Sequence, residues 1–282
     1  MAVKIITDSA CDLPKELINE HDITVLPIMV YVDDKEYLDS VNLMPETLYT
    51  HLKAGAKVKT AQIPMGHFLE TFEGIATSED HYIYLAFSSN LSGTYQTAML
   101  AKENLLETYP EMNLEIIDTK CVSLGLGLIV VEAAKMAKNG ADLEKIKAYI
   151  YEAMGTMEHV FSVDNLDYLF RGGRVTRAQA SIGNILNIKP ILNVQDGFLI
   201  PIDKVKGKKK RLQCLYDYAT SQGTRLDLQT IGIAHADNAD DAELIKAHFE
   251  TAFGATKFVV SELGCAVGAH CGPGMISIFF RR

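Results

Sequence analysis

The stretch HYIYLAFSSNLSGTYQTAMLA, residues 81–101, joins an apolar run to a helical pattern through a loop rich in hydroxyl groups. Residues 82–87 are apolar and rich in β-forming side chains, which predicts a strand, and the pattern over residues 94–110 predicts a helix. Four hydroxyl side chains stand at the junction: Ser88, Ser89, Ser92 and Thr94. A strand that passes into a helix is the repeating unit of a parallel sheet covered by helices.

The same alternation continues through the first half of the chain. Apolar runs predict further strands at residues 3–9, 23–32 and 114–119. Amphipathic runs predict further helices at residues 13–21, 45–55, 65–76 and 123–138. Because strands that alternate with helices imply a mostly parallel sheet wrapped by helices, we expect an α/β domain over residues 1–155.

The second half has a different order of elements. A strand begins near residue 159, and helical segments up to residue 187 are broken at Gly172-Gly173. Asp196-Gly197 lies between two short β runs and is a strong hairpin signal. The remaining elements are predicted as helices at 212–221 and 240–254 and as strands at 230–236, 257–263 and 274–280. This order indicates a smaller α+β domain with a mixed sheet over residues 156–282, and a cleft between two domains is a favoured ligand site.

Composition limits the possible partners and the location. The chain has 282 residues, 48% of them hydrophobic, and a net charge of −9, which argues against general binding of nucleic acid or anionic membranes. No apolar run approaches the roughly 18 residues of a membrane-spanning helix, and the N-terminus lacks the features of a signal peptide. The five cysteines are scattered without a C-x-x-C pair. We therefore expect reduced thiols, no metal site, and a soluble cytoplasmic protein.

The hydroxyl-rich loop is the first candidate site. In parallel α/β sheets, ligands bind outside the carboxyl ends of the strands, and this loop follows such an end. Ser92 or Thr94 can cap the next helix, whose free N–H groups favour an anion, and a hydroxyl group not used in capping can donate to that anion. Ser89 and Gly93 belong to the same loop as supporting residues. Plain helix capping and loop solvation are the alternative for each of them.

Two other stretches can reach the same place. VKTAQIP, residues 58–64, sets Thr60 and Gln62 ahead of a helix, and an ordinary turn is the alternative there. GAHCGPGMIS, residues 268–277, is expected as a loop that carries His270 before the last strand. Its glycines allow close approach of the backbone to a ligand, and an imidazole can donate a hydrogen bond to an anion. An ordinary surface histidine is the alternative.

Two basic stretches are candidates for binding negative charge. FRGGRVTR, residues 170–177, places Arg171 and Arg174 around a Gly-Gly break, and guanidinium groups bind carboxylates or phosphates through paired hydrogen bonds. Exposed arginines at helix ends are the alternative. DKVKGKKKRL, residues 203–212, holds six basic residues without the pattern of a P-loop. It is expected to be a solvated loop or a docking surface for an acidic partner or a phosphorylated group.

Polar residues also follow the first strand, in ITDSACD, residues 6–12. For Asp8, Ser9 and Asp12 we favour helix capping over a ligand site. The sequence contains no G-x-S-x-G elbow, no H-E-x-x-H, no kinase motifs and no G-x-G-x-x-G after a strand. It therefore predicts no catalytic residue and no nucleotide site.

Five motifs in this order, TDSACDLP, TAQIP, SSNLSGTYQ, LDYLFRGGRV and GAHCGPG, resemble the DegV family of bacterial fatty-acid-binding proteins over Val3 to Phe280. The resemblance implies two α/β domains with one fatty acid buried between them. For some members it also implies a role as the acyl-carrying subunit of a two-component fatty-acid kinase, whose separate ATP-binding subunit phosphorylates the bound carboxyl group. FRGGR departs from the family pattern, in which a basic residue often precedes that arginine.

The resemblance implies that Thr60 and Ser92 hydrogen-bond the fatty-acid carboxylate, with His270 close by. Physical chemistry supports such a pair, because a buried carboxylate costs several kcal/mol unless donors meet it. Burial of about 15 methylene groups contributes on the order of 12 kcal/mol before ordering costs, at roughly 0.8 kcal/mol each. The hydroxyl groups would hold the anion without acting as nucleophiles.

Charge near the site is implied to come from Arg171 or Arg174, at or near the mouth of the pocket. Lys206 and Lys208, in the basic run, are implied to dock the ATP-binding kinase subunit. Beyond the fatty acid, the resemblance implies no cofactor.

Two alternative functions remain open from the residues. A hydrolase or acyltransferase would use Ser92 as nucleophile and His270 as base, although no strained elbow surrounds Ser92 and no orienting acid for the histidine is evident. A binder of a small phosphorylated metabolite or sugar would use the same hydroxyl-rich loop to hold a phosphate group.

Overall fold

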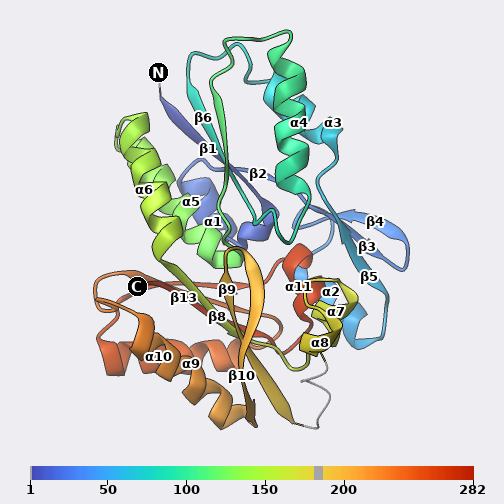
Figure 1. Cartoon of the computed structure of the whole chain (residues 1–282), viewed down its shortest axis with the longest axis vertical. Coiled ribbons are helices and arrows are strands. Elements are labelled where there is room, and N and C mark those ends of the chain that lie inside the picture. Colours follow the sequence, from blue (N-terminus) through green and yellow to red (C-terminus); the bar gives the residue numbers. More distant parts are fainter. Residues whose placement is uncertain (1, 181–186) are drawn as a thin grey trace.

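The computed structural model describes residues 2–180 and 187–282, so that residues 181–186 of the predicted helical stretch lie outside the described residues (Figure 1). The first half contains a parallel sheet in the strand order β2-β1-β6-β7. Its strands are β1 (Val3–Asp8), β2 (Thr24–Leu26), β6 (His81–Ala86) and β7 (Leu114–Asp118). This sheet and its helices confirm the predicted α/β class.

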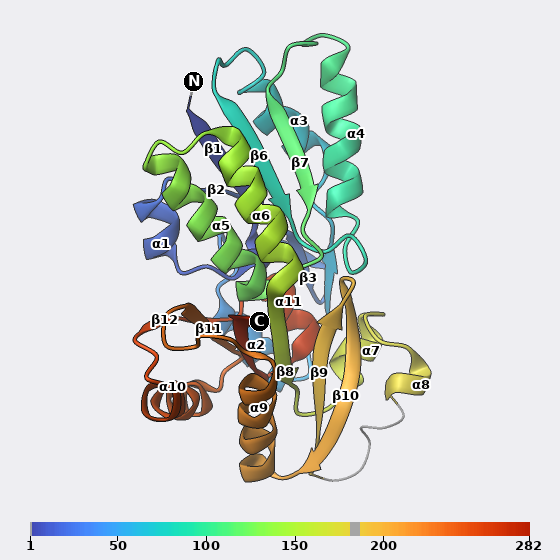
Figure 2. The same ribbon diagram turned by 60° about the vertical axis from the view of Figure 1, so that its left-hand side comes forward.

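Helices cover both faces of this sheet, α3 and α4 on one face and α5 and α6 on the other (Figures 1 and 2). Alternate residues of β1 point to opposite faces of the sheet. Ile5 belongs to the hydrophobic cluster with residues of α5, and Ile6 belongs to the cluster with residues of α3 and α4. The helices of this half are η1 (Ser9–Cys11), α1 (Lys15–Glu20), α2 (Pro45–Lys53), α3 (Met65–Glu73), α4 (Thr94–Leu106), α5 (Ser123–Lys138) and α6 (Leu143–Thr156). The sequence analysis missed α6, which Asp142 caps by accepting from the Lys145 N–H.

A small antiparallel sheet was also missed. The predicted strand over residues 23–32 is two strands in two different sheets, because the chain is interrupted at Pro27, which has no N–H for a sheet ladder. The second piece pairs in the order β4-β3-β5. These strands are β3 (Met29–Val32), β4 (Lys35–Leu38) and β5 (Val58–Ala61). The ordinary turn, which was the alternative for VKTAQIP, is wrong for its first residues, since Thr60 lies in β5.

The second half contains the mixed sheet that the sequence predicted, in the order β10-β9-β8-β13-β11-β12. Its strands are β8 (Met157–Ser162), β9 (Ile188–Gln195), β10 (Phe198–Lys206), β11 (Thr230–His235), β12 (Lys257–Glu262) and β13 (Ile276–Arg281). Among the strand pairings of the described residues in this sheet, only β11–β12 is parallel. The β9–β10 hairpin turns at Asp196 and Gly197, whose φ angles of 48° and 80° are those of the expected tight turn.

Five helices complete the described part of the second half. They are α7 (Asp167–Arg171), α8 (Arg177–Ala180), α9 (Lys208–Gln222), α10 (Ala239–Phe253) and α11 (Cys265–Cys271). The expectation of a loop around His270 is wrong, because His270 lies in the last turn of α11. This helix packs against α2, α7 and β5, so a segment near the C-terminus reaches elements of the first half.

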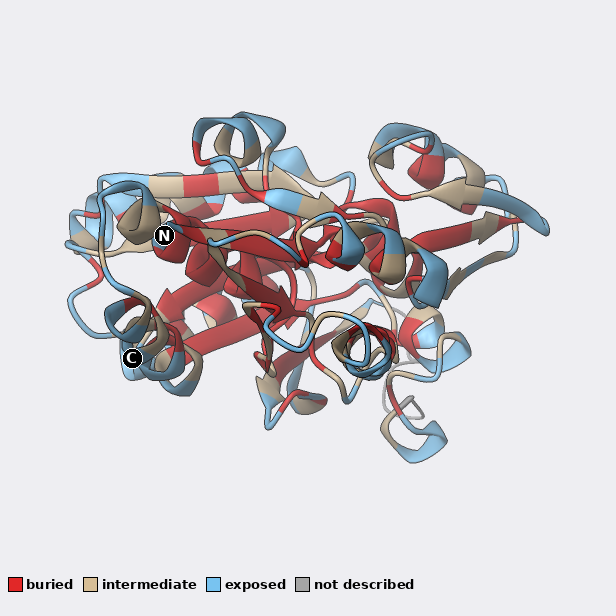
Figure 3. Cartoon of the chain, turned by 90° about the horizontal axis from the view of Figure 1, so that it is seen from above, coloured by how far each residue is buried: buried red, intermediate tan, exposed pale blue. Residues whose placement is uncertain are grey.

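The largest hydrophobic cluster crosses both halves of the chain. It includes Leu124 of α5 and Phe279 of β13, and a view from above shows buried strands surrounded by helices with exposed outer faces (Figure 3). The division at residue 155 remains a prediction, and the chain runs directly from α6 into β8 at that point. Among residues 2–180 and 187–282, no helix combines the length and the apolar character needed to cross a membrane.

Candidate functional site

A cavity of about 430 Å³ is lined by residues from both halves of the chain. Its volume is in the range typical of small-molecule sites. Most of its lining is apolar: Ala10, Ile28, Ala61, Phe87, Leu91, Val122, Phe161, Leu169, Leu199, Ala266, Val267, Met275 and Phe279. Polar and charged side chains also line it, among them Thr60, Gln62, Ser92, Arg174 and His270. A molecule with a long apolar part and one polar group matches this lining.

Thr60 and His270 meet at the polar part of the cavity. The Thr60 Oγ1 atom lies 2.7 Å from His270 Nε2, although the two residues are 210 positions apart in sequence. Thr60 projects from β5 and His270 from α11, and these two elements pack together. Ser92 contributes a second hydroxyl group, 2.9 Å from Thr94 Oγ1. An anion bound at this place would meet hydroxyl donors and a neutral imidazole.

Arg174, and not Arg171, is the arginine that lines this cavity. Its Nε and Nη2 atoms donate to the Leu91 carbonyl oxygen at 3.0 and 2.8 Å, which fixes the guanidinium beside the loop that carries Ser92. Arg171 instead lies over the Tyr168 ring, 4.6 Å from its centre. Burial lowers the pKa of Arg174, but an arginine stays protonated at neutral pH, so the site keeps a positive charge.

A second cavity of about 330 Å³ adjoins the first, and Thr60, Arg174 and His270 line both. Every charged side chain among the described residues that line the second cavity is basic: Lys57, Lys59, Arg171 and Arg174. The two cavities therefore share their polar residues, and the second has positive charge on its walls. Arg171 belongs to this second space.

His270 is expected to make the stability of the ligand-free protein depend on pH. Burial, aided by the positive charge of Arg174, lowers the pKa of His270 to about 3. The unfolded chain has a histidine pKa of about 6.5, so between these values only the unfolded state takes up the proton. The free energy of unfolding should therefore fall as the pH is lowered from about 6.5 towards 3, by up to ~1.4 kcal/mol per pH unit.

Urea unfolding at pH 7 and pH 5 checks this expectation. The His270→Gln variant should lose less stability between the two pH values than the unaltered protein. The buried His159, whose pKa burial lowers to about 4, is present in both proteins and cancels in the comparison. Equal losses in the two proteins would contradict a neutral, buried His270.

The hydroxyl groups of the loop after β6 fall into two sets, one that contacts other parts of the protein and one that lines the cavity. Ser88 Oγ donates to the Gly197 carbonyl oxygen at 2.9 Å, and Asn90 Nδ2 donates to that of Asp196 at 2.6 Å. Ser89 Oγ pairs with Asp118 and accepts from Lys120 Nζ. The first part of the loop therefore holds the tip of the β9–β10 hairpin, and only its second part faces the cavity.

The start of α4 departs from the expected capping. Gly93 is the N-cap residue and has no side chain that could accept a hydrogen bond from the helix. The Thr94 N–H donates to Ser92 Oγ at 3.2 Å. Thr94 is fully buried and accepts from the Ile63 N–H at 3.4 Å. A Cβ atom at Gly93 would lie 2.0 Å from Gln62 Oε1, so glycine lets these two segments touch. Gln62 in turn donates to Thr97 Oγ1.

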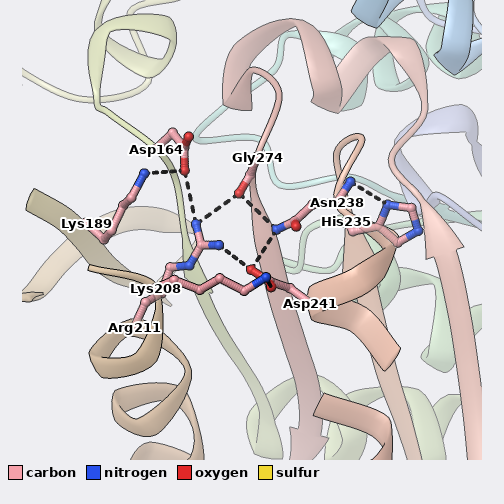
Figure 4. A network of polar contacts seen from close by, with 8 residues as sticks. All are labelled: Asp164, Lys189, Lys208, Arg211, His235, Asn238, Asp241 and Gly274. Atoms are coloured by element: carbon pink, nitrogen blue, oxygen red, sulfur yellow. Dashed lines mark hydrogen bonds and ion pairs between the residues drawn. The ribbon is translucent and has the colours of Figure 1, made fainter. Parts of the chain in front are cut away.

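The basic run is not a solvated loop. Lys206 ends β10, Lys208 begins α9, and Arg211 is 4% exposed. Figure 4 shows Lys208 and Arg211 converging on the carboxylate of Asp241, which is fully buried. Lys206 remains exposed, and neither it nor Lys208 lines the two cavities described above.

Comparison with known proteins identifies the family. The family profile described as "Uncharacterised protein, DegV family" matches residues 2–282. The chain belongs to the DegV family. A DegV domain-containing protein of Caldanaerobacter subterraneus is 37% identical to it over 280 residues, which is 99% of each chain.

Solved structures share the fold of this DegV-family chain. A structure described as "Fatty Acid Binding of a DegV family Protein from Thermus thermophilus" superposes with a TM-score of 0.89 at 26% identity, and all of both chains is covered. The Streptococcus pneumoniae Fatty Acid Kinase (Fak) B3 protein, loaded with linoleic acid, superposes with a TM-score of 0.88. It is 22% identical, covering 100% of this chain and 99% of that chain, and this likeness shows the common fold.

Sequence reasoning on this DegV-family chain missed the two lysines of the second cavity. Lys59 directly precedes Thr60 in β5, and Lys57 directly precedes that strand. The signal was the presence of two lysines within three residues of Thr60, which could have suggested positive charge near it. The apolar lining could not be selected from the sequence, because core residues show the same local pattern.

Proposed function

We propose that this protein binds a long-chain fatty acid, with the tail in the 430 Å³ cavity and the carboxylate at its polar part. Thr60, Ser92 and His270 would form hydrogen bonds to the carboxylate, and Arg174 would supply the compensating charge. The observation that carries the proposal is a mostly apolar cavity in which Thr60 and His270 already form a hydrogen-bonded pair. Fatty-acid binding by the DegV-family protein from Thermus thermophilus, which has the same fold, supports the same ligand class.

Energetics favour such a ligand. About 15 buried methylene groups contribute on the order of 12 kcal/mol before ordering costs. An ionised carboxylate in the same cavity would be costly if unpaired, and it would therefore require the donors at the polar part. Anchoring the carboxylate would also fix the direction in which the tail enters.

The two alternative functions fit this geometry less well. A Ser92 nucleophile requires a base within hydrogen-bond reach, whereas the Ser92 side chain hydrogen-bonds Thr94, and His270 pairs with Thr60. A small phosphorylated metabolite would leave the long apolar wall without a partner. We therefore propose binding without catalysis by this chain.

Native mass spectrometry tests the ligand. The protein is purified from a bacterial host without added lipid, and its mass is compared under native and denaturing conditions. An excess native mass equal to that of a fatty acid is the expected result. A ligand-free native mass, together with no uptake of added palmitate or oleate, would reject the fatty-acid proposal.

The second cavity supports a further step, presentation of the bound carboxyl group to an ATP-binding kinase subunit. A phosphoryl group added to the carboxylate would need space and positive charge, and the second cavity has both next to Thr60 and His270. Lys206 and Lys208 would contact the kinase subunit. In this scheme the chain carries the acyl group and the partner supplies ATP.

Charge reversal at Lys206 tests the docking surface. Lys206→Glu is expected to weaken the complex with the kinase subunit by about tenfold or more at low salt, because opposite surface charges steer and hold such complexes. Its fatty-acid content should stay unchanged. Lys257→Glu is the matched control, since it reverses an exposed lysine on β12, at the opposite edge of the same sheet. Equal effects of the two substitutions would contradict docking through the basic run.

A further inference from the structure

The position of His270 depends on helix α11, which would not be stable in isolation. Helix α11 has only seven residues, far fewer than an isolated helix needs for stability in water. Its N-cap residue, Gly264, has no side chain with which to satisfy the free N–H groups of the first turn. The position of His270 is therefore determined by the groups that hold α11 from outside.

Two buried carboxylates hold the first turn of α11. Asp12 Oδ1 accepts from the Gly264 N–H at 2.8 Å, and Asp39 Oδ1 accepts from the Cys265 N–H at 2.7 Å. Both aspartates come from the other end of the chain and are at most 5% exposed. A side-chain oxygen at a helix N-terminus satisfies a free N–H group of the first turn, and burial raises the pKa of both aspartic acids.

The carboxylates are themselves fixed by hydroxyl groups. Ser9 Oγ donates to Asp39 Oδ2 at 2.8 Å, and Ser123 Oγ donates to Asp12 Oδ2 at 2.5 Å. Asp12 and Ser9 belong to the TDSACD stretch, for which local capping was the favoured interpretation. That interpretation is correct for Asp8, which caps the adjacent η1 helix, whereas Asp12 reaches a helix 252 residues away.

The opposite end of α11 has little room for displacement. A Cβ atom at Gly172 would lie 2.1 Å from His270 Nδ1, which shows how closely α7 and the imidazole approach. On its other side the ring forms the 2.7 Å contact with Thr60. A tilt of α11 at its first turn would therefore change the contact between His270 and Thr60.

We propose that Asp12 and Asp39 are positioning residues of the carboxylate site, which set the His270–Thr60 contact by holding the first turn of α11. The effect on ligand affinity rests on the proposed function. The effect on the imidazole does not, because the Thr60–His270 hydrogen bond exists without a ligand.

Variants of Asp39 test the effect on affinity. Asp39→Ala is expected to bind palmitate at least about tenfold more weakly, because loss of one buried hydrogen bond frees the helix start. Asp39→Asn keeps an acceptor for the Cys265 N–H and should bind within about threefold of the unaltered protein. The control is Glu158→Ala, which removes another buried carboxylate, bonded to the Tyr218 hydroxyl group and to Arg282 and not to α11. Glu158→Ala should lower stability and keep affinity.

The imidazole nitrogen shifts of His270 provide a second measurement. In ¹⁵N NMR spectra at pH 7, Asp39→Ala should move the His270 Nε2 resonance towards its value in Thr60→Val, where the hydrogen bond is absent, and Asp39→Asn should leave it in place. Asp12→Ala gives the same test if Asp39→Ala does not fold. Unchanged affinity and an unchanged resonance in a folded alanine variant would overturn the proposal. If the unaltered protein binds no fatty acid, the proposed function fails, while the resonance still decides the positioning role.

Discussion

Replacing Thr60 and Ser92 together by alanine is expected to weaken fatty-acid binding by about 10²–10⁴-fold. Each hydroxyl group would donate to an ionised carboxylate, and a hydrogen bond to a charged group contributes ~1.5–3 kcal/mol. The two together would account for ~3–6 kcal/mol, and each 1.4 kcal/mol is a factor of about ten in affinity. Titration of the delipidated protein with palmitate, followed by native mass spectrometry, measures the loss.

Ser89→Ala is the matched control for this prediction. Ser89 lies in the same loop three residues before Ser92, but its hydroxyl group pairs with Asp118 and Lys120 and does not line the cavity. It should therefore bind palmitate within about threefold of the unaltered protein. Folding of the double variant is checked by circular dichroism. A folded double variant with nearly unchanged affinity would show that the carboxylate lies elsewhere.

Replacing Arg211 by methionine is expected to lower the free energy of unfolding by about 3–5 kcal/mol. The side chain of Arg211 is 5% exposed and pairs with Asp241, which is fully buried. It also donates to Asp164 and to the Gly274 carbonyl oxygen, both at 3.1 Å (Figure 4). Removing one partner of a buried ion pair leaves the other charge poorly compensated, and this cost is larger than the net contribution of the intact pair.

Urea unfolding at neutral pH measures this change. The control is Arg225→Met, which removes the exposed arginine of the Arg225–Asp227 pair, and surface pairs contribute only about 0–1 kcal/mol. A further variant, Arg211→Met with Asp241→Leu, should recover part of the lost stability, because it leaves no unpaired carboxylate at that position. Similar small losses in Arg211→Met and Arg225→Met would show that Asp241 is compensated without Arg211.

Local patterns in the sequence were sufficient for much of the fold. The apolar run before Ser88 and the helix after Gly93 were predicted within a few residues, because strand and helix periodicity depends on neighbouring residues. The Asp196-Gly197 hairpin was predicted for the same reason, since its turn needs two residues that tolerate positive φ. The mixed sheet of the second half followed from the order of these elements.

Elements that depend on distant partners were assigned wrongly. Helix α11 was expected as a loop because it is short and rich in glycine, whereas Asp12 and Asp39, from the other end of the chain, accept from the N–H groups at its start. For the basic run the solvated-loop alternative was wrong, because Lys208 begins α9 and Arg211 is buried in a pair with Asp241. No local pattern can indicate a partner that lies tens or hundreds of residues away.

The sequence by itself determined which residue types could hold an anion, and it selected Thr60, Ser92 and His270 as separate candidates. Only the tertiary structure decided that Thr60 and His270 touch across 210 positions and that Arg174, and not Arg171, lines the cavity with them. It also decided that Ser89 faces Asp118, away from the cavity. The physical reason is that side-chain chemistry is fixed residue by residue, whereas the direction and distance of a side chain depend on how strands and helices far apart in sequence pack together.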